Sequence, residues 1–179
     1  MFKVRTPISL DKQEILNLYR KVAMLSGGIA RSEEEISEDY IEELMQYSAL
    51  TGLQLVVEHP VTPELIIAEM HGYKLIPKAF SHVLSNLTIA VDPDFQGKGV
   101  GKLIFSSFIN HISDDRPDIL RVELVTHESN AKALRLYKAL GFVIEGRLEK
   151  RIRFPGKELE TDIPMAWFNK NFNGHGQST

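Results

Sequence analysis

The chain has 179 residues, of which 43% are apolar and 25% are charged, a size and composition that suit one globular domain with a sizeable core. Its net charge of −3 disfavours nucleic acid as a partner, because a phosphate backbone needs a basic face. The absence of cysteine excludes disulfides, thiolate metal sites and a cysteine nucleophile. The first residues carry charges and form no apolar leader, and no apolar run is long enough to span a bilayer. We therefore expect a cytoplasmic protein with no membrane contact.

The first third of the chain has the pattern of two amphipathic helices. Apolar residues recur at helical spacing over residues 9–25, which predicts a first helix that ends at Gly27-Gly28. Ser32 and Glu35 form a capping-box signature, so we expect a second helix from there to about Gly52. The residues at helical spacing are Ile15, Leu18, Tyr19, Val22 and Leu25 in the first helix, and one face of the second carries Ile36, Tyr40, Leu44 and Tyr47.

The rest of the chain alternates strand and helix patterns. Strands are predicted at residues 53–58, 65–73, 84–91, 120–126, 142–154 and 160–168, and helices at residues 99–112 and from Ser129 or Asn130 to Leu140. This order predicts a mixed sheet flanked by helices rather than a strict βα repeat. The polar tail, residues 171–179, is expected to be disordered, which leaves residues 1–170 as a single domain.

A glycine-rich segment, QGKGVG at residues 96–101, joins a predicted strand to a predicted helix. A helix N-terminus presents N–H groups without intrahelical acceptors, and glycines let a phosphate approach the backbone. The Walker pattern would need a glycine at Gln96 and Ser or Thr at Leu103. The dinucleotide pattern GxGxxG would need a glycine at Lys102 or Ile104. The segment therefore predicts a phosphate site of another kind, or a tight turn that uses glycine for its geometry alone.

A second pattern lies in the helix predicted to begin near Asn130. Asn130, Ala133 and Tyr137 are spaced i, i+3 and i+7, so they share one stripe of that helix. The stripe can offer an amide, a small surface and a phenol to one extended ligand. A core helix capped by an asparagine would show the same spacing.

With these two motifs the chain resembles the GNAT superfamily of acetyl-CoA-dependent N-acetyltransferases. Residues 96–101, preceded by IAVDPDF at 89–95, match the family's pyrophosphate pattern Gln/Arg-x-x-Gly-x-Gly/Ala. Residues 130–142 match its second signature, Asn-x-x-Ala-x-x-Leu-Tyr-x-x-x-Gly-Phe. Segments 141–148 and 162–166 are similar to the bacterial branch that acts on amino acids or protein N-termini. The resemblance implies an α/β (α+β) fold in which a mixed, mostly antiparallel central sheet is splayed between two parallel strands and flanked by about four helices.

The resemblance also implies a function, the transfer of an acetyl group from acetyl-CoA to a primary amine by direct attack. The acceptor would be a small molecule such as an amino acid, or a protein N-terminus. Tyr137 would be the general acid for the leaving CoA thiolate, and no metal is implied. The implied acetyl-CoA contacts are Ile89, Ala90 and Val91 at the pantetheine arm, Gln96, Gly97, Lys98, Gly99, Val100 and Gly101 at the pyrophosphate, and Asn130, Ala133 and Tyr137 from the second signature.

The general base is not identified by the resemblance. Many relatives place a Glu five residues before the asparagine, where this chain has Val125, or at the start of the preceding strand, where residues 84–86 read Leu-Ser-Asn. Glu123 and His127 share a strand face with Val125 by alternation, and either could act directly or through a water. The departure also leaves open a non-catalytic acyl-CoA sensor of the same fold. Relatives often form homodimers, so the resemblance is compatible with a homodimer, while the sequence itself leaves the oligomeric state open.

Overall fold

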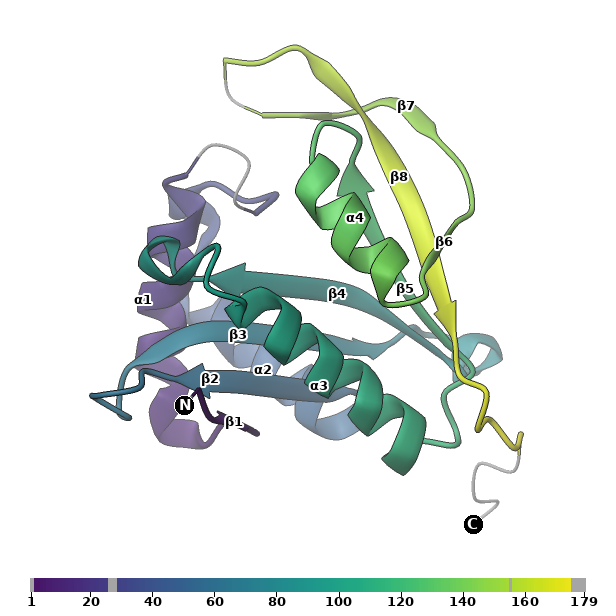
Figure 1. Ribbon diagram of the computed structural model, residues 1–179, viewed down its shortest axis with the longest axis horizontal. Coiled ribbons are helices and arrows are strands. Elements are labelled where there is room, and N and C mark those ends of the chain that lie inside the picture. The colour runs from purple at the N-terminus through teal and green to yellow at the C-terminus, as the bar shows by residue number, and fades with distance from the viewer. Residues whose placement is uncertain (1, 26–28, 155, 175–179) are drawn as a thin grey trace. The chain divides into compact units, whose positions relative to one another are not determined.

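The computed structural model describes residues 2–25, 29–154 and 156–174, and Figure 1 labels its helices and strands. The chain divides into two compact units, Met1–Tyr73 with Thr88–Phe108, and Lys74–Leu87 with Ile109–Thr179. The helix end predicted at Gly27-Gly28 lies outside the described residues. Within the described ranges, no helix has both the length and the apolar character needed to cross a membrane.

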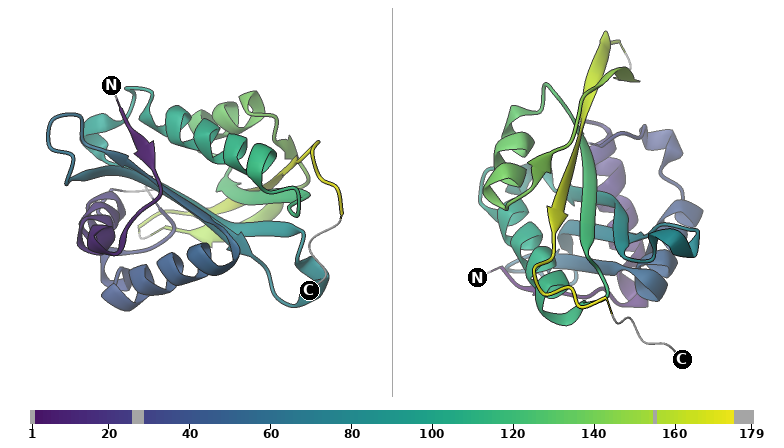
Figure 2. Two further views of the ribbon diagram at one scale, coloured as in Figure 1. Left: turned by 90° about the horizontal axis from the view of Figure 1, so that it is seen from below. Right: turned by 90° about the vertical axis from the view of Figure 1, so that its right-hand side faces the viewer.

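The first unit is a sheet covered by helices on both faces. Its elements are β1 (Val4–Arg5), α1 (Lys12–Ala23), α2 (Glu38–Thr51), β2 (Leu53–Glu58), β3 (Ile66–Lys74), the second half of β4 (Val83–Val91) and the first half of α3 (Val100–Asp115), with 3-10 turns at Ser9–Asp11, Glu33–Glu35 and Pro93–Phe95. β1 and β3 each pair with β2 in antiparallel fashion, and the Asp92 N–H donates to the Ile67 carbonyl at 2.8 Å. In Figure 2, α1 and α2 cover one face of β2 and β3, and α3 covers the other.

The inward faces of the two helices agree with the predicted pattern except at two positions. Leu25 is 40% exposed and Tyr47 is 52% exposed, so these two members of the apolar stripes are not part of the buried face. Leu25 lies beyond the end of α1 at Ala23, where helical spacing no longer applies. Tyr47 instead stacks on Tyr73 with ring centroids 5.3 Å apart.

The second helix also begins later than predicted. The capping box of Ser32 and Glu35 is present, but it caps the short turn Glu33–Glu35. α2 begins at Glu38 after a cap of its own, in which Ser37 Oγ accepts the Tyr40 N–H at 3.1 Å. Ser32 and Ser37 both precede this helix and both can act as caps. The capping-box pattern predicted Ser32, whereas the helix is capped by Ser37.

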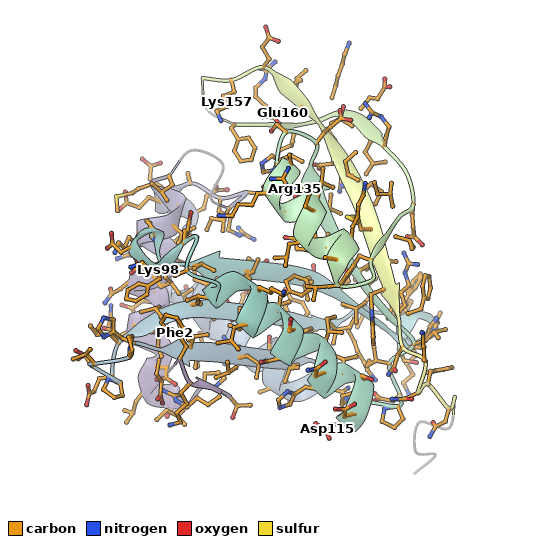
Figure 3. The ribbon with its side chains drawn as sticks, in the orientation of Figure 1. Phe2, Lys98, Asp115, Arg135, Lys157 and Glu160 are labelled. Atoms are coloured by element: carbon orange, nitrogen blue, oxygen red, sulfur yellow. The ribbon has the colours of Figure 1, made fainter. Side chains whose placement is uncertain are left out.

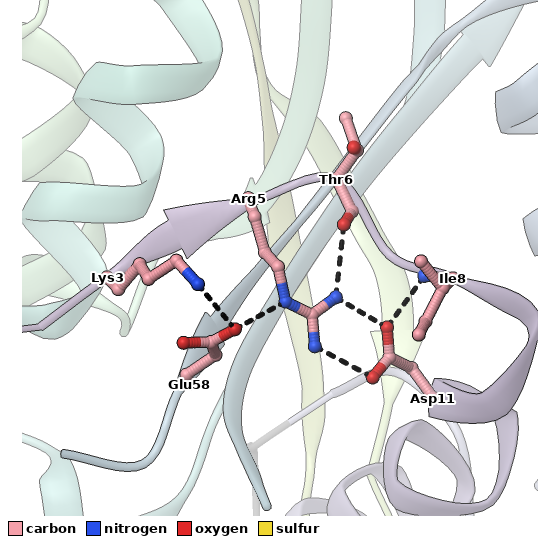
Figure 4. A network of polar contacts seen from close by, with 6 residues as sticks. All are labelled: Lys3, Arg5, Thr6, Ile8, Asp11 and Glu58. Carbon is pink, nitrogen blue, oxygen red and sulfur yellow. Dashed lines mark hydrogen bonds and ion pairs between the residues drawn. The ribbon is translucent and has the colours of Figure 1, made fainter. Parts of the chain in front are cut away.

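Arg5 connects β1 to the start of α1 and the end of β2 (Figure 4). Its Nη1 and Nη2 atoms donate to the two carboxylate oxygens of Asp11 at 2.6 and 2.9 Å, and its Nε donates to Glu58 at 2.6 Å. Asp11 also accepts the Ile8 N–H at 2.7 Å. Burial works to raise the pKa of Asp11, but the hydrogen bonds from Arg5 and Ile8 lower that pKa below its usual value. The network therefore stabilises the ionised carboxylate.

The second unit carries the parallel strand pair that the resemblance implied. Its elements are the 3-10 turn Lys78–Phe80, the first half of β4, the end of α3, β5 (Arg121–His127), α4 (Ala131–Ala139), β6 (Val143–Ile144), β7 (Leu148–Arg153) and β8 (Leu159–Phe168). β4 runs parallel to β5, with Val83 opposite Arg121. β8 is antiparallel to β5, β6 and β7. The predicted class is thus confirmed, since the sheet is mixed and mostly antiparallel and the described residues form four α-helices.

The single strand predicted at residues 142–154 is in fact two strands, β6 and β7. The interruption faces Pro164 of β8, which has no N–H to continue the ladder. The Pro164 carbonyl accepts the Glu145 N–H at 3.0 Å. Past the gap, the register of β7 shifts between Leu148 and Ile152. Gly146 lies in the gap, and a Cβ added there would be 3.7 Å from the Pro164 ring, so Pro164 in the partner strand and the local glycine both fit the interruption.

The described start of the predicted tail is hydrogen-bonded. Asn171 donates from Nδ2 to the Ser113 carbonyl at 3.0 Å, and the Asn173 N–H donates to the Pro117 carbonyl at 3.2 Å. Residues 175–179 lie outside the described part of the chain.

Candidate functional site

The glycine-rich loop lies in the first unit, between β4 and α3. Gly97 and Gly99 have φ angles of +76° and +85°, a backbone region that strongly favours glycine. Apart from the glycine itself and its two chain neighbours, a Cβ added at either position would have no protein atom within 4 Å. The protein itself therefore leaves space at the loop, on the side where a side chain would project.

The residues around the loop fix its shape and favour an anion. Gln96 donates from Nε2 to the Val91 carbonyl at 3.2 Å, and Val100 is fully buried at the start of α3. The Lys98 ammonium lies 4.9 Å from the centre of the Phe95 ring, and Figure 3 labels this lysine. α3 is 16 residues long, so its first N–H groups and its dipole present positive charge. This geometry fits a phosphate group.

The carboxylates that precede the loop are paired with a lysine. Lys21 Nζ lies 2.8 Å from an oxygen of Asp92 and 2.8 Å from an oxygen of Asp94. The ion pair with Lys21 lowers the pKa of Asp94. These negative charges are therefore partly offset beside a site expected to hold an anion.

The β4 residues before the loop are those expected to contact the pantetheine arm. Ala90 is fully buried, while Ile89 and Val91 are half-buried. Earlier in the strand, Asn86 has a φ of +53°, a left-handed conformation that asparagine tolerates better than most residues. The sequence analysis did not anticipate this irregularity, and the residue type was its available signal.

Asn130 and Ala133 lie in the second unit and are bonded to one another. The Asn130 Oδ1 accepts the Ala133 N–H at 3.1 Å, so Asn130 is the N-cap of α4. The cap uses the side-chain oxygen, and the side-chain NH2 group can still donate to another group. The two readings of this asparagine, cap and ligand contact, are therefore compatible.

Tyr137 lies on α4, with 9% of its surface exposed. Its ring centre is 6.1 Å from that of Phe142, which follows the turn at Gly141, where φ is +91°. Burial raises the pKa of Tyr137 to about 12. The phenol therefore keeps its proton at neutral pH and can act as a donor.

Glu123 and His127 lie on one face of β5 with Val125, as predicted, because the burial of the strand alternates. The Arg121 Nε donates to Glu123 Oε2 at 2.9 Å, and the same guanidinium pairs with Glu145. The His127 ring packs against Phe154. Glu123 is thus a partner in an ion pair, which engages its Oε2 atom.

A buried polar cluster in the first unit was missed by the sequence analysis. Glu69, which is fully buried, accepts hydrogen bonds from Tyr19 Oη at 2.5 Å and Gln54 Nε2 at 2.8 Å. The His71 Nδ1 lies 3.1 and 3.2 Å from the two carboxylate oxygens. Burial and the charge of Glu69 raise the pKa of Tyr19 well above 10. Alternation along β3 places Glu69, His71 and Tyr73 on one face, but polar residues at that spacing usually indicate a solvent-facing surface.

The predicted site residues thus form two sets. Residues 89–91 and 96–101 lie together in the first unit, and Glu123, Asn130, Ala133 and Tyr137 lie in the second. Within the described ranges, no group of three or more His, Cys, Asp or Glu side chains is arranged to hold a metal ion.

Comparison with known proteins identifies the same family as the two motifs. Residues 55–144, half of the chain, match the sequence model of the acetyltransferase (GNAT) domain. The [Ribosomal protein bS18]-alanine N-acetyltransferase of Salmonella typhimurium is 39% identical over 54 residues, which are 30% of this chain and 35% of that protein. The spermine/spermidine N(1)-acetyltransferase of Bacillus subtilis is 36% identical over 59 residues, 33% of this chain and 38% of that protein. The match therefore spans little more than a third of each curated relative.

Solved structures extend the likeness in fold to nearly the whole chain. A GNAT superfamily phosphinothricin acetyltransferase from Sinorhizobium meliloti, in complex with acetyl-CoA, has a TM-score of 0.77 at 21% sequence identity. The alignment covers 99% of this chain and 91% of that one.

Proposed function

The chain belongs to the GNAT acetyltransferase family, and on this premise we propose that it transfers the acetyl group of acetyl-CoA to a primary amine. The observation that carries the proposal is the loop at residues 96–101, whose two left-handed glycines leave open space at the N-terminus of α3. We propose that residues 1–170 act as one GNAT domain. The acceptor is the amine of a small molecule or of a protein N-terminus. The names of two relatives give one example of each class, spermine or spermidine and the alanine of a ribosomal protein.

Acetyl-CoA is assigned to the residues that the two signatures select. Backbone N–H groups of residues 96–101 donate to the pyrophosphate, and Lys98 adds a positive charge beside it. The backbone of residues 89–91 pairs with the pantetheine amides and polarises the thioester carbonyl. Asn130 and Ala133 contact the arm, the former through its side-chain NH2 group.

The reaction forms a C–N bond and breaks the C–S bond of the thioester. The attacking nitrogen loses a proton, and the departing sulfur gains one. Tyr137 donates to that sulfur, because its raised pKa of about 12 keeps the phenol protonated at the pH of the reaction. The proton on nitrogen is assigned to Glu123, released from Arg121, with His127 and ordered water as the alternatives.

The second candidate function is a non-catalytic sensor that binds acetyl-CoA. Two observations favour it, namely Val125 at the position where many relatives have a Glu, and the ion pair that engages Glu123. The two functions share the cofactor and differ in turnover.

Calorimetric titration with acetyl-CoA, followed by thiol detection across a panel of amines, tests both candidates. The panel contains polyamines, amino acids and peptides with an N-terminal alanine. The enzyme proposal expects binding together with CoA release by at least one class of amine. Binding without release across the whole panel would favour the sensor, and absence of binding would contradict both functions.

The proposal also covers the cellular location and the oligomeric state. The lack of cysteine and the net charge of −3 support a reducing, cytoplasmic environment and argue against nucleic acid as a partner. A homodimer is proposed by analogy with the family. Light scattering coupled to size-exclusion chromatography distinguishes a dimer from a monomer.

A further inference from the structure

Arg31 is a cation held by an aromatic ring. Its guanidinium carbon lies 4.2 Å from the centre of the Tyr40 ring. None of the ion pairs between described residues includes Arg31. The nearby carboxylate of Glu35 accepts the Ser32 N–H at 2.7 Å. The hydrogen bonds from Ser32 and the charge of Arg31 lower the pKa of the Glu35 carboxyl. Arg31 therefore sits on an aromatic face beside a carboxylate that is already hydrogen-bonded elsewhere, an arrangement that another cation can replace.

The Tyr40 ring belongs to a continuous group of aromatic side chains from α1, α2 and β3. Its successive ring centres are 5.3 to 6.4 Å apart. Tyr47 at one end is 52% exposed, Tyr40 at the other end is half-buried, and Tyr19 between them is fully buried. The members, in order of contact, are Tyr40, Tyr19, His71, Tyr73 and Tyr47. The group therefore extends from the surface into the interior of the first unit.

A buried carboxylate lies beside the two buried middle members of this group, Tyr19 and His71. Glu69 is bonded to Tyr19 and Gln54 and lies beside His71, and no lysine or arginine is among its partners in the described part of the chain. Burial raises the pKa values of Tyr40 and Tyr73, and the positive charge of Arg31 opposes both shifts. One cation thus acts on two phenols that face the same region.

We propose that the aromatic cluster, defined as Tyr19, Tyr40, Tyr47 and Tyr73 with Glu69, receives a second, non-reacting ammonium group of the acceptor. In the absence of acceptor, Arg31 occupies its place. The inference rests on the proposed acetyltransferase function and specifies its acceptor as a di- or polyamine. Aromatic faces and a buried carboxylate both attract cations, and both attractions become stronger as water is excluded.

The strand order makes this assignment geometrically reasonable. Within the first unit, the Asp92 N–H to Ile67 carbonyl bond places β3 beside β4, whose residues 89–91 are assigned to the pantetheine arm. Neighbouring strands are about 4.8 Å apart. An alkyl chain of about four or five carbons can therefore join an amine near β4 to an ammonium group near β3.

The test compares 1,5-diaminopentane with 1-aminopentane, which share a reacting end and differ in the distal ammonium. We expect kcat/KM to favour the diamine in the wild-type protein. Arg31→Ala removes the competing cation and should lower the KM for the diamine about two- to tenfold, with that for the monoamine unchanged. Arg153→Ala, an exposed arginine in the second unit, is the matched control and should leave both values unchanged.

Two substitutions at Tyr40 test the aromatic face. Tyr40→Phe keeps the ring and should keep the preference for the diamine, whereas Tyr40→Leu should reduce that preference about two- to tenfold. Circular dichroism melts of both variants establish that they are folded. Equal preference in the two variants would overturn the assignment.

Calorimetric titration of the Arg31→Ala protein with 1,5-diaminopentane separates this inference from the enzyme proposal. Diamine binding that Tyr40→Leu weakens, without turnover, would support the cluster and contradict the enzyme. Turnover with equal kcat/KM for the two amines would contradict the cluster alone. An Arg31→Ala variant that raises KM for glutamate but not for the diamine would show that Arg31 binds an anion, which would also overturn the inference.

Discussion

Replacement of Gly99 by alanine separates anion binding from backbone geometry at the 96–101 loop. Gly99 has a φ of +85°, and an added Cβ would meet no protein atom within 4 Å. The direct effect on stability is therefore conformational, about 1–2 kcal/mol for an L-residue in the left-handed region. In a chain of this length, a loss of about 1 kcal/mol in the free energy of unfolding lowers the melting temperature by about 2–4 °C. A bound pyrophosphate would in addition meet the new methyl group.

Acetyl-CoA affinity should fall more than stability does. Displacing the phosphate from charge-assisted hydrogen bonds removes about 1.5–3 kcal/mol of binding free energy. This loss raises the Kd for acetyl-CoA roughly tenfold to a hundredfold. Calorimetry measures the Kd, and thermal melting of the unliganded protein measures the loss of stability.

Gly156→Ala is the matched control for this experiment. Gly156 has a φ of +71° and also has no protein atom within 4 Å of an added Cβ, but it lies between β7 and β8. Its variant should lose similar stability and keep the wild-type Kd. If Gly99→Ala also keeps the wild-type Kd, the loop uses glycine for geometry alone and the reasoning is refuted.

Three further predictions follow from other parts of the structure. Tyr137→Phe should lower kcat about 10²- to 10⁴-fold with little change in the Kd for acetyl-CoA; a wild-type kcat would remove Tyr137 as the acid. Glu69→Gln should lower the free energy of unfolding in urea by about 1–3 kcal/mol, since buried donors lose an acceptor, whereas Glu43→Gln, at an exposed position, should change it little; equal losses would contradict the network. Burial works to raise the pKa of Asp11, but hydrogen bonds from Arg5 lower it below its usual value. The ionised Asp11 therefore stabilises the folded protein fully above the unfolded pKa of about 4, and this contribution is lost as pH falls toward the folded pKa. Asp11→Asn should therefore flatten the dependence of unfolding free energy on pH between about pH 5 and about pH 2, and an unchanged slope would contradict this role.

The parts of the fold that the sequence predicted well are those with local causes. The strand at residues 53–58 has the predicted bounds because Gly52 ends the preceding helix and His59-Pro60 follows. The split between β6 and β7 has a distant cause, since it depends on Pro164 in the partner strand. Gly146 is a local sign of an interruption, but no local pattern in residues 142–154 records that Pro164 will lie opposite.

The candidate site shows the same division. The 96–101 loop could be predicted because left-handed glycines at a helix start are encoded by adjacent residues. The cluster around Glu69 could not, because its bond to Tyr19 joins residues 50 positions apart.

Quantification of both products of a single incubation tests the central claim most directly. The protein is mixed with acetyl-CoA carrying an isotopically labelled acetyl group and with 1,5-diaminopentane, and mass spectrometry follows the label while a thiol reagent measures free CoA. We predict labelled N-acetylated amine and free CoA in equal amounts, both abolished when the protein is omitted. Acetyl-CoA that binds but stays intact, with this diamine and across the amine panel, would contradict an acetyltransferase.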